Sequence, residues 1–146
     1  MNKVIILQGL PGSGKSTWAK QYCRENPDAF TLNRDSLRKM LNNGEWSAKT
    51  EEFVKAIELS ALEIILKGTD NATVIIDDTN LNLKTVNNLL KVCNSLEADV
   101  ALKDFFHVPL HECIERDSKR EKPVGSSAII RMNEKLIKFK SYTSKL

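Results

Sequence analysis

Long apolar runs are missing from this sequence. No segment approaches the roughly 20 consecutive apolar residues of a transmembrane helix, and no basic leader with an apolar stretch precedes the first strand-like segment, which begins at Lys3. These absences argue against both a membrane span and a secretory signal. We therefore expect a cytoplasmic protein with no membrane partner.

Cysteines are also few. Cys23, Cys93 and Cys113 are widely separated, and each stands among apolar or helical positions. This distribution favours reduced thiols in the core over a disulfide framework. Because no CxxC or HExxH spacing occurs, His107, His111 and Cys113 do not indicate a metal site.

Neither sign of charge is in large excess. The net charge is +3, which does not by itself indicate nucleic acid as a partner. From residue 131 onward, however, five basic side chains stand against the single acid Glu134: Arg131, Lys135, Lys138, Lys140 and Lys145. A basic terminal helix is either a solvated face or a contact for nucleic acid, and the sequence leaves both interpretations open.

The chain is too short for two ordinary domains. Its 146 residues, 41% of them hydrophobic, suffice for one globular core. No internal repeat, low-complexity tract or linker divides them. We expect a single domain over residues 1–146, and the sequence does not indicate its oligomeric state.

Four short apolar segments predict strands. The first, Val4–Leu7, runs into a cluster of glycine, proline and serine, as expected of a buried parallel strand that ends in a loop. The other three are expected at residues 30–32, 73–76 and 100–106, and a helix at 17–24 follows the first loop. Strands that alternate with helices predict an α/β fold of three layers, with a central parallel sheet of about four strands.

Further helices are expected between the later strands and after them. Apolar residues repeat at helical spacing in two segments, namely Phe53, Ile57, Ala61 and Ile64, then Leu83, Val86, Leu90 and Cys93. Pro109 suits the first turn of another helix. Ser126 or Ser127 can cap a last helix that carries Ile130 and Ile137 on one face.

Residues 9–16, GLPGSGKS, match the phosphate-binding loop (P-loop) motif GxxxxGK[ST], and they lie between a buried strand and a helix as its mechanism requires. Its glycines let successive N–H groups point at phosphate oxygens, and the helix N-terminus adds partial positive charge. Lys15 is expected to reach the β- and γ-phosphates, while the Ser16 hydroxyl ligates Mg²⁺. The motif therefore predicts ATP, or another NTP, with Mg²⁺, bound by Gly9, Gly12, Ser13, Gly14, Lys15, Ser16 and Thr17.

Signatures of other P-loop classes are missing. The sequence contains neither DxxG nor NKxD, which a GTPase switch normally carries, and a motor ATPase would be larger. A small chain with basic residues in a late segment fits a phosphoryl transferase whose lid closes over the nucleotide. Residues 116–122, RDSKREK, are either such a helical lid, with Arg116 and Arg120 on the transferred phosphoryl group, or a solvated helix end.

Two polar segments follow the second and third strands. Residues 33–38, NRDSLR, open a helix and place Asp35 and Arg38 on one helical face, where Asp35 can act as general base and Arg38 can clamp the acceptor. The alternative is that Asp35 caps the helix and pairs with Arg38 at the surface. Asp77 and Asp78 end the third strand, where one carboxylate can hold Mg²⁺ through water or face the acceptor.

The assembled pattern resembles the kinase domain of bacteriophage-type polynucleotide 5′-kinases along nearly the whole chain. The resemblance is carried by four strings, which are VIILQGLPGSGKSTWAK at 4–20, NRDSLR at 33–38, IIDDTNLN at 75–82 and RDSKR at 116–120. It implies an adenylate-kinase-like fold and transfer of the γ-phosphate to the 5′-hydroxyl end of DNA or RNA. Family members often carry a phosphatase or ligase domain as well, for which this chain has no room, so we expect a stand-alone kinase or a fragment.

Carried over by position, the resemblance implies a role for individual residues. Lys15 and Ser16 hold phosphates and metal, Asp35 is the general base, and Arg120 is the lid arginine on the donor phosphates. The expected acceptor-side residues are Arg34, Asp35, Arg38, Asp78, Thr79 and Asn80. Asp77 precedes the aspartate that matches the family pattern, so its role stays open.

Two other functions share the P-loop. A kinase of a small metabolite, similar to gluconate or shikimate kinases, would need a closed acceptor pocket, whereas a polynucleotide end needs an open basic mouth. A nucleotide-dependent binding protein would have no use for the base that Asp35 offers. The sequence indicates no preference between DNA and RNA, between single strands and duplex ends, or among triphosphates.

Overall fold

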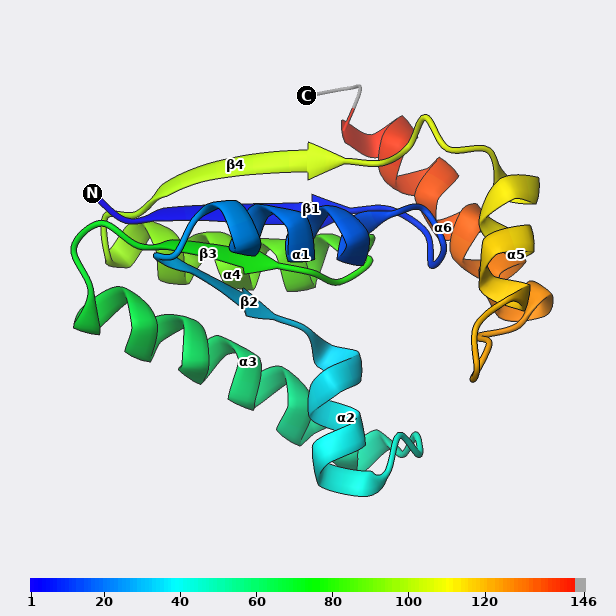
Figure 1. The fold of residues 1–146 in the computed structure, drawn as a ribbon, viewed down its shortest axis with the longest axis horizontal. Helices are drawn as coiled ribbons and strands as arrows, with labels where there is room; N and C mark the ends of the chain where they lie inside the picture. The colour runs from blue at the N-terminus through cyan, green and yellow to red at the C-terminus, as the bar shows by residue number, and fades with distance from the viewer. Residues whose placement is uncertain (144–146) are drawn as a thin grey trace.

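A four-stranded parallel sheet forms the middle layer of the protein, in a computed structural model that describes residues 1–143 (Figure 1). The strands are β1 (Lys3–Gln8), β2 (Ala29–Leu32), β3 (Thr73–Ile76) and β4 (Asp99–Asp104), in the spatial order β2-β3-β1-β4. Ile5 of β1 lies opposite Ile75 of β3 and Ala101 of β4. The predicted α/β fold with a central parallel sheet is therefore confirmed.

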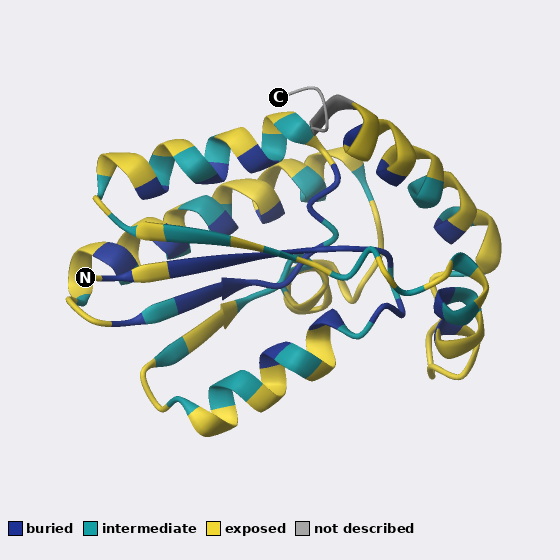
Figure 2. Ribbon diagram, turned by 90° about the horizontal axis from the view of Figure 1, so that it is seen from above, coloured by how far each residue is buried: buried dark blue, intermediate teal, exposed yellow. Residues whose placement is uncertain are grey.

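Helices cover both faces of the sheet, so that β1 and β3 are buried between them (Figure 2). On one face, α1 (Lys15–Glu25) packs its Ala19 with residues of β1 and β3. The other face is covered by α3 (Ala48–Gly68) and α4 (Leu83–Ser95). Its cluster of buried side chains contains Val4, Ile6, Leu62, Leu66, Val74, Ile76, Leu89 and Cys93. Burial on both faces explains the continuous apolar runs of the two central strands.

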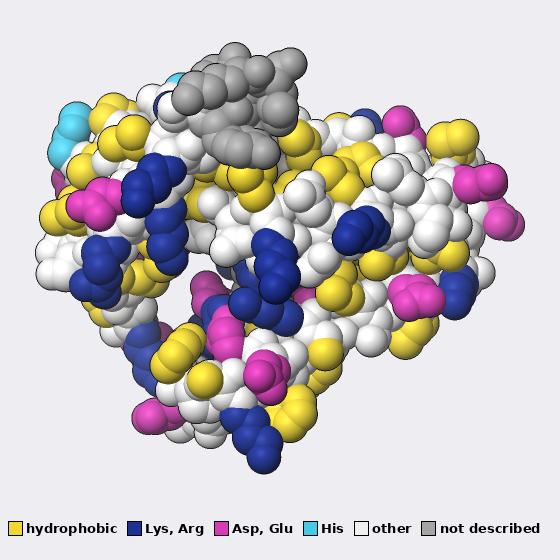
Figure 3. All heavy atoms as spheres, turned by 180° about the vertical axis from the view of Figure 1, so that it is seen from behind, with side chains coloured by type: hydrophobic (Ala, Val, Ile, Leu, Met, Phe, Trp, Pro, Cys, Tyr) yellow, Lys and Arg dark blue, Asp and Glu magenta, His cyan; other side chains and the backbone are white. Residues whose placement is uncertain are grey.

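The remaining helices lie at the carboxyl ends of the strands. From β2 the chain enters α2 (Arg34–Asn42), and beyond β4 it forms α5 (Leu110–Ser118) and α6 (Ser126–Thr143). The last two pack on the P-loop through Leu10, Cys113 and Ile129. Seen from behind, the surface is hollowed toward this end of the sheet (Figure 3). Within residues 1–143, no helix has the length and apolar character to cross a membrane.

The helical spacing located α3 and α6 but did not identify their buried faces. In α3 the buried positions are Val54, Glu58, Leu62 and Leu66, while Phe53 and Ile64 are exposed. In α6, Ile129 and Leu136 are buried, and the predicted pair Ile130 and Ile137 faces solvent. Both helices carry more apolar residues than the neighbouring elements cover. In α3 the buried face also includes the carboxylate of Glu58. A prediction from hydrophobic spacing alone therefore chose the adjacent face of each helix.

Two predicted boundaries are also corrected. The strand expected to reach residue 106 ends at Asp104, because the Asp104 carboxylate accepts a hydrogen bond from the Phe106 N–H and turns the chain. Ser126 is the first residue of α6 and not its cap. The loop before it is held instead by the buried Asp117, which accepts the N–H groups of Val124 and Gly125 at 3.0 and 2.9 Å.

Candidate active site

The P-loop connects β1 to α1 in a backbone conformation that needs glycine. Gly12 and Gly14 have φ values of 81° and 100°, which other residues rarely adopt. Gly12 also lies so close to α5 that a Cβ atom would collide with the carbonyl oxygen of Cys113. Gly14 immediately precedes α1, so the loop brings its N–H groups to the N-terminus of that helix.

Lys15 lies inside the loop that it follows. Its Nζ donates hydrogen bonds to the carbonyl oxygens of Gly9 and Leu10 at 2.9 and 2.7 Å, and the Ser13 hydroxyl is 3.4 Å away. Burial lowers the pKa of Lys15 to about 8, although the Asp77 carboxylate opposes the shift. At neutral pH the Lys15 amine is therefore protonated in most molecules, and its positive charge lies where the motif predicts phosphates.

Ser16 and Asp77 form the part of the site that suits a metal ion. The Ser16 hydroxyl donates to Oδ2 of Asp77 at 2.8 Å. The other carboxylate oxygen, Oδ1, is buried and has no hydrogen-bond partner among the described residues. Burial raises the pKa of Asp77, and the hydrogen bond from Ser16 opposes this rise. A hydroxyl beside a carboxylate with a free oxygen fits Mg²⁺, and the structure places Asp77, not Asp78, next to Ser16.

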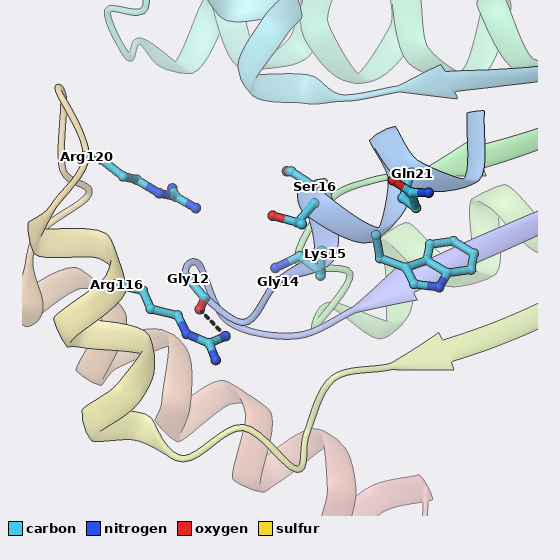
Figure 4. Close-up of a pocket in the computed structure, with 9 residues that line it drawn as sticks. Gly12, Gly14, Lys15, Ser16, Gln21, Arg116 and Arg120 are labelled. Carbon is cyan, nitrogen blue, oxygen red and sulfur yellow. Dashed lines mark hydrogen bonds between the residues drawn. The ribbon is translucent and has the colours of Figure 1, made fainter. Parts of the chain in front are cut away.

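A pocket of about 720 Å³ opens over the P-loop. Figure 4 shows Arg116 and Arg120 reaching toward the loop from α5 and the turn after it. Arg116 donates to the carbonyl oxygen of Gly12 at 3.4 Å, and Arg120 lies 3.7 Å from the Asp117 carboxylate. We call this the P-loop pocket; the predicted residues that line it are Gly12, Gly14, Lys15, Ser16, Thr17, Arg116 and Arg120.

Two further lining residues of the P-loop pocket escaped sequence analysis. Trp18 and Gln21 extend it along α1, and Gln21 lies one helical turn beyond Thr17. Trp18 packs at 5.2 Å from the ring of Tyr22, with the ammonium of Lys103 at 5.0 Å. The signal was available, since both residues follow the motif on the helix that the motif opens.

The helix that carries Asp35 is capped by Asn33. The Asn33 Oδ1 accepts the Ser36 N–H at 2.8 Å, and its Nδ2 donates to the carbonyl oxygen of Asp77 at 2.5 Å. This cap ties the start of α2 to the end of β3. Asp35 therefore does not cap the helix; its carboxylate is 73% exposed and pairs with Arg38.

Arg38 has a second acidic partner that sequence analysis missed. Its guanidinium binds Glu51 of α3 through two N–H groups, with Nε 2.7 Å from Oε2. This interaction raises the pKa of Arg38 and lowers the pKa of Glu51. Arg38 is thus held between Asp35 and Glu51, which orients it before any substrate binds.

Asp78 belongs to a buried acidic pair beneath α2. Its Oδ1 accepts the Arg34 N–H at 2.8 Å, and Arg34 Nε lies 3.4 Å from Oδ2 and 3.9 Å from Glu58 of α3. Burial, and next the hydrogen bond with Asp78, raise the pKa of Glu58 to about 9. Glu58 is therefore a neutral acid at pH 7. The only sign of this acidic pair in the sequence was a glutamate at a position of α3 where the helical spacing would place a core residue.

Thr79 and Asn80 connect this region to the P-loop. The carbonyl oxygen of Thr79 accepts the Gly9 N–H at 3.1 Å. Asn80, with a left-handed φ of 49° and a side chain buried below the surface, donates to the carbonyl oxygen of Leu7 at 2.6 Å. Thr79 lines a second pocket. The buried Asn80 side chain does not line it and instead supports the backbone at the end of β1.

This second pocket, of about 580 Å³, is lined in part by the loop after β3. Its lining comes from α2, α3, the segment after β3, the start of α4, and α6. The basic side chains that line it are Arg34, Arg38, Lys55, Lys84, Lys135 and Lys138, and we call it the basic pocket. Two lysines of the predicted basic helix thus reach a pocket, while Lys145 lies outside the described residues.

Comparison with known proteins places this geometry among kinases. Residues 4–138 match the family described as AAA domain. A chain of the Pnkp1/Rnl/Hen1 RNA repair complex superimposes with a TM-score of 0.82 and 32% identity, over 97% of this chain and 46% of that chain.

Two curated relatives are similar in sequence. The L-seryl-tRNA(Sec) kinase of Methanococcus maripaludis is 30% identical over 140 residues, which cover 90% of this chain and 51% of the relative. A bifunctional polynucleotide kinase/RNA ligase of Autographa californica nuclear polyhedrosis virus is 28% identical, over 96% of this chain and 22% of its own length. This chain thus spans about half of the first relative and less of the second.

These comparisons confirm the nucleotide-binding kinase that the P-loop predicted, and the resemblance to polynucleotide kinases with it. The match to the family covers most of the described chain, from β1 to α6. The chain belongs to the AAA domain family and has a P-loop kinase-like fold.

Proposed function

We propose that this kinase transfers the γ-phosphate of ATP, or of another NTP, to the 5′-hydroxyl end of DNA or RNA. The observation that carries the proposal is a pair of pockets, one over the P-loop and one lined by six basic side chains. The P-loop pocket suits a triphosphate, and the basic pocket suits an acceptor that bears phosphates. The names of both curated relatives include a nucleic acid as well.

On the donor side, the protein supplies charge and position. Lys15 and the N–H groups of the P-loop bind the β- and γ-phosphate oxygens, and Arg116 and Arg120 approach from the opposite wall. Ser16 and Asp77 would hold Mg²⁺, which supplies charge neutralisation at the phosphates when it is bound.

On the acceptor side, the oxygen of the 5′-hydroxyl attacks the γ-phosphorus, and Asp35 accepts the proton of that hydroxyl. The bond from that phosphorus to the bridging oxygen breaks, and the nucleoside diphosphate leaves. The exposed Asp35 carboxylate is free to meet an incoming hydroxyl, and Arg38 orients it. Arg38 and Arg34 line the basic pocket, where the phosphate next to the reacting nucleoside would lie.

A small metabolite is the alternative acceptor. The shape and charge of the basic pocket favour a polynucleotide, because its six basic side chains line an open hollow and not a closed cavity. An uncharged sugar would leave most of these charges without a partner.

Transfer from labelled ATP tests the proposal directly. The acceptors are 5′-hydroxyl oligonucleotides of DNA and RNA, the same oligonucleotides carrying a 5′-phosphate, nucleosides, and a panel of sugars. We expect label on the 5′-hydroxyl oligonucleotides only. Label on a sugar in preference to every oligonucleotide would overturn the proposal and leave a metabolite kinase in its place.

A further inference from the structure

The basic side chains of the basic pocket fall into two groups. Arg34 and Arg38 are both paired with buried or half-buried acids. The four lysines have no salt bridge among the described residues: Lys55, Lys84, Lys135 and Lys138. The arginine charges are therefore already balanced, whereas the lysine charges are available to an anion from outside.

α6 contributes two of these lysines from a single face. Met132, Lys135 and Lys138 are spaced three residues apart, and all three line the pocket. The other face of α6 packs Ile129 and Leu136 against α5 and the P-loop region. Because packing fixes the helix on one side, the lysines on the pocket side have a defined position.

Apolar side chains line the same pocket as the lysines. Leu81 lines the pocket from the segment after β3, Leu83 from the start of α4, and Met132 and Phe139 from α6. Cationic side chains around an apolar surface match a chain of nucleotides, whose phosphates are charged and whose bases are flat and apolar on their faces. An isolated phosphate would use the first feature only, and an uncharged sugar would use neither.

The pocket is open enough for an acceptor to extend out of it. Figure 3 shows the hollow from behind, with lysine and arginine side chains around its rim and acidic side chains within it. The lysines come from three helices, α3, α4 and α6, so their charges are spread along the rim and not gathered at one point. Such a distribution fits several phosphates in succession.

We infer that Lys135 and Lys138, together with Lys55 and Lys84, bind the phosphodiester backbone of the acceptor beyond its first nucleotide. The inference rests on the proposed function and adds a specificity to it: the kinase favours acceptors of several nucleotides over nucleosides and dinucleotides. Arg38 serves the reacting end, and α6 holds the strand that follows it.

The test compares acceptors of two lengths in two variants. Lys135→Gln/Lys138→Gln removes two rim charges while keeping helix-forming side chains. The control Lys140→Gln removes a charge from the same helix, where the ammonium lies 5.1 Å from the Phe106 ring and does not line the pocket. KM is measured for a 5′-hydroxyl dinucleotide and for a single strand of about 20 nucleotides, at low and high salt.

We expect the double variant to raise KM for the long acceptor about tenfold and to leave the KM values for the dinucleotide and ATP unchanged. For the long acceptor, the slope of log (1/KM) against log salt concentration should be shallower by about 1.4 in the double variant. Two phosphate contacts are lost, and each contact with a single strand contributes about 0.7 to the slope. Equal effects on both acceptor lengths, or an equal effect of Lys140→Gln, would overturn the inference while leaving the proposed function intact. If no 5′-hydroxyl oligonucleotide were phosphorylated by the unaltered protein, the proposed function itself would fail.

Discussion

The P-loop pocket and the basic pocket differ in how the chain builds them. One continuous segment, residues 12–21, supplies most of the P-loop pocket, and α5 and the turn after it add Arg116 and Arg120. The basic pocket takes its lining from four separate segments between residues 34 and 139. A continuous segment can be recognised as a motif, whereas a pocket assembled from distant segments depends on the fold. The donor can therefore be inferred from the sequence with much greater certainty than the acceptor.

The largest effect is expected in the P-loop pocket. Lys15→Ala should reduce transfer to every acceptor by about 10²- to 10³-fold, because it removes a buried charge at the phosphates. Circular dichroism and thermal unfolding should show a folded protein, since the Lys15 side chain does not belong to an apolar cluster.

Lys20→Ala is the matched control for this variant. Lys20 is an exposed lysine on the same helix, and its removal should leave the rate unchanged. Near-normal transfer by a folded Lys15→Ala protein would contradict the kinase mechanism and the contrast between the pockets.

The next effect is expected at the start of α2. Asp35→Asn should slow the chemical step by about 10²- to 10⁴-fold, because an amide keeps the shape but cannot accept the hydroxyl proton. ATP affinity should stay the same, as Asp35 lies outside the P-loop pocket. Single-turnover rates and nucleotide titrations measure the two quantities separately. If the single-turnover rate fell by less than about fivefold, Asp35 would not be the general base, and its role would be limited to the ion pair with Arg38.

Arginines from the two pockets should separate kinetically. Arg120→Ala should impair every acceptor alike, whereas Arg38→Ala should impair most the acceptors with a phosphate next to the reactive hydroxyl. Charged hydrogen bonds contribute about 1.5 to 3 kcal/mol, so each loss should be about tenfold or more. Steady-state kinetics with a nucleoside and a nucleoside 3′-phosphate distinguish the two patterns.

Glu51→Gln sharpens the same comparison. It weakens the ion pair that orients Arg38 without touching the P-loop pocket, so it should reproduce part of the Arg38→Ala pattern. If Arg38→Ala and Arg120→Ala gave the same pattern over all acceptors, the assignment of one arginine to each pocket would be wrong.

The sequence predicted the sheet and the P-loop because each depends on a local pattern. Four apolar runs and one eight-residue motif were enough. It did not predict Glu51, because the ion pair with Arg38 forms between two helices whose packing no spacing rule gives. It also could not assign Asp77 and Asp78, since adjacent residues at a strand end point to opposite sides and only their neighbours identify each side.

The basic helix shows the same limit from another direction. Its lysines were visible in the sequence, and both a solvated face and a nucleic-acid contact were reasonable interpretations. Only the fold brings Lys135 and Lys138 to a pocket that also holds Arg34 and Arg38. The buried stripe of α3 was missed for a related reason, because Glu58 occupies a position that hydrophobic periodicity assigns to an apolar residue.

Two buried ionisable groups have opposite pKa shifts: Lys15, which lines the P-loop pocket, and Glu58, which lies beside Arg34 of the basic pocket. Burial lowers the pKa of Lys15 to about 8 from 10.5, and it raises the pKa of Glu58 to about 9 from 4.5. The groups that face Glu58 are Asp78, which raises its pKa, and Arg34 and Arg38, which lower it. Between about pH 5 and pH 8, folded Glu58 keeps a proton that the unfolded chain has lost.

Stability should therefore fall as pH rises through this window, which gives the smallest of the expected effects. The native state binds more protons than the unfolded state here, so the contribution of Glu58 to the free energy of unfolding decreases by roughly 1 kcal/mol per pH unit at most. Glu58→Gln is neutral at every pH and can still donate a hydrogen bond to Asp78, so it should remove this slope and leave transfer activity intact. Urea unfolding at pH 6 and pH 7.5 measures the slope of the free energy of unfolding against pH.

The control is Glu52→Gln, at an exposed position of the same helix. This variant should keep the slope of the unaltered protein. Parallel pH dependences for Glu58→Gln and the unaltered protein would mean that Glu58 is ionised in the fold, and its raised pKa would then be wrong.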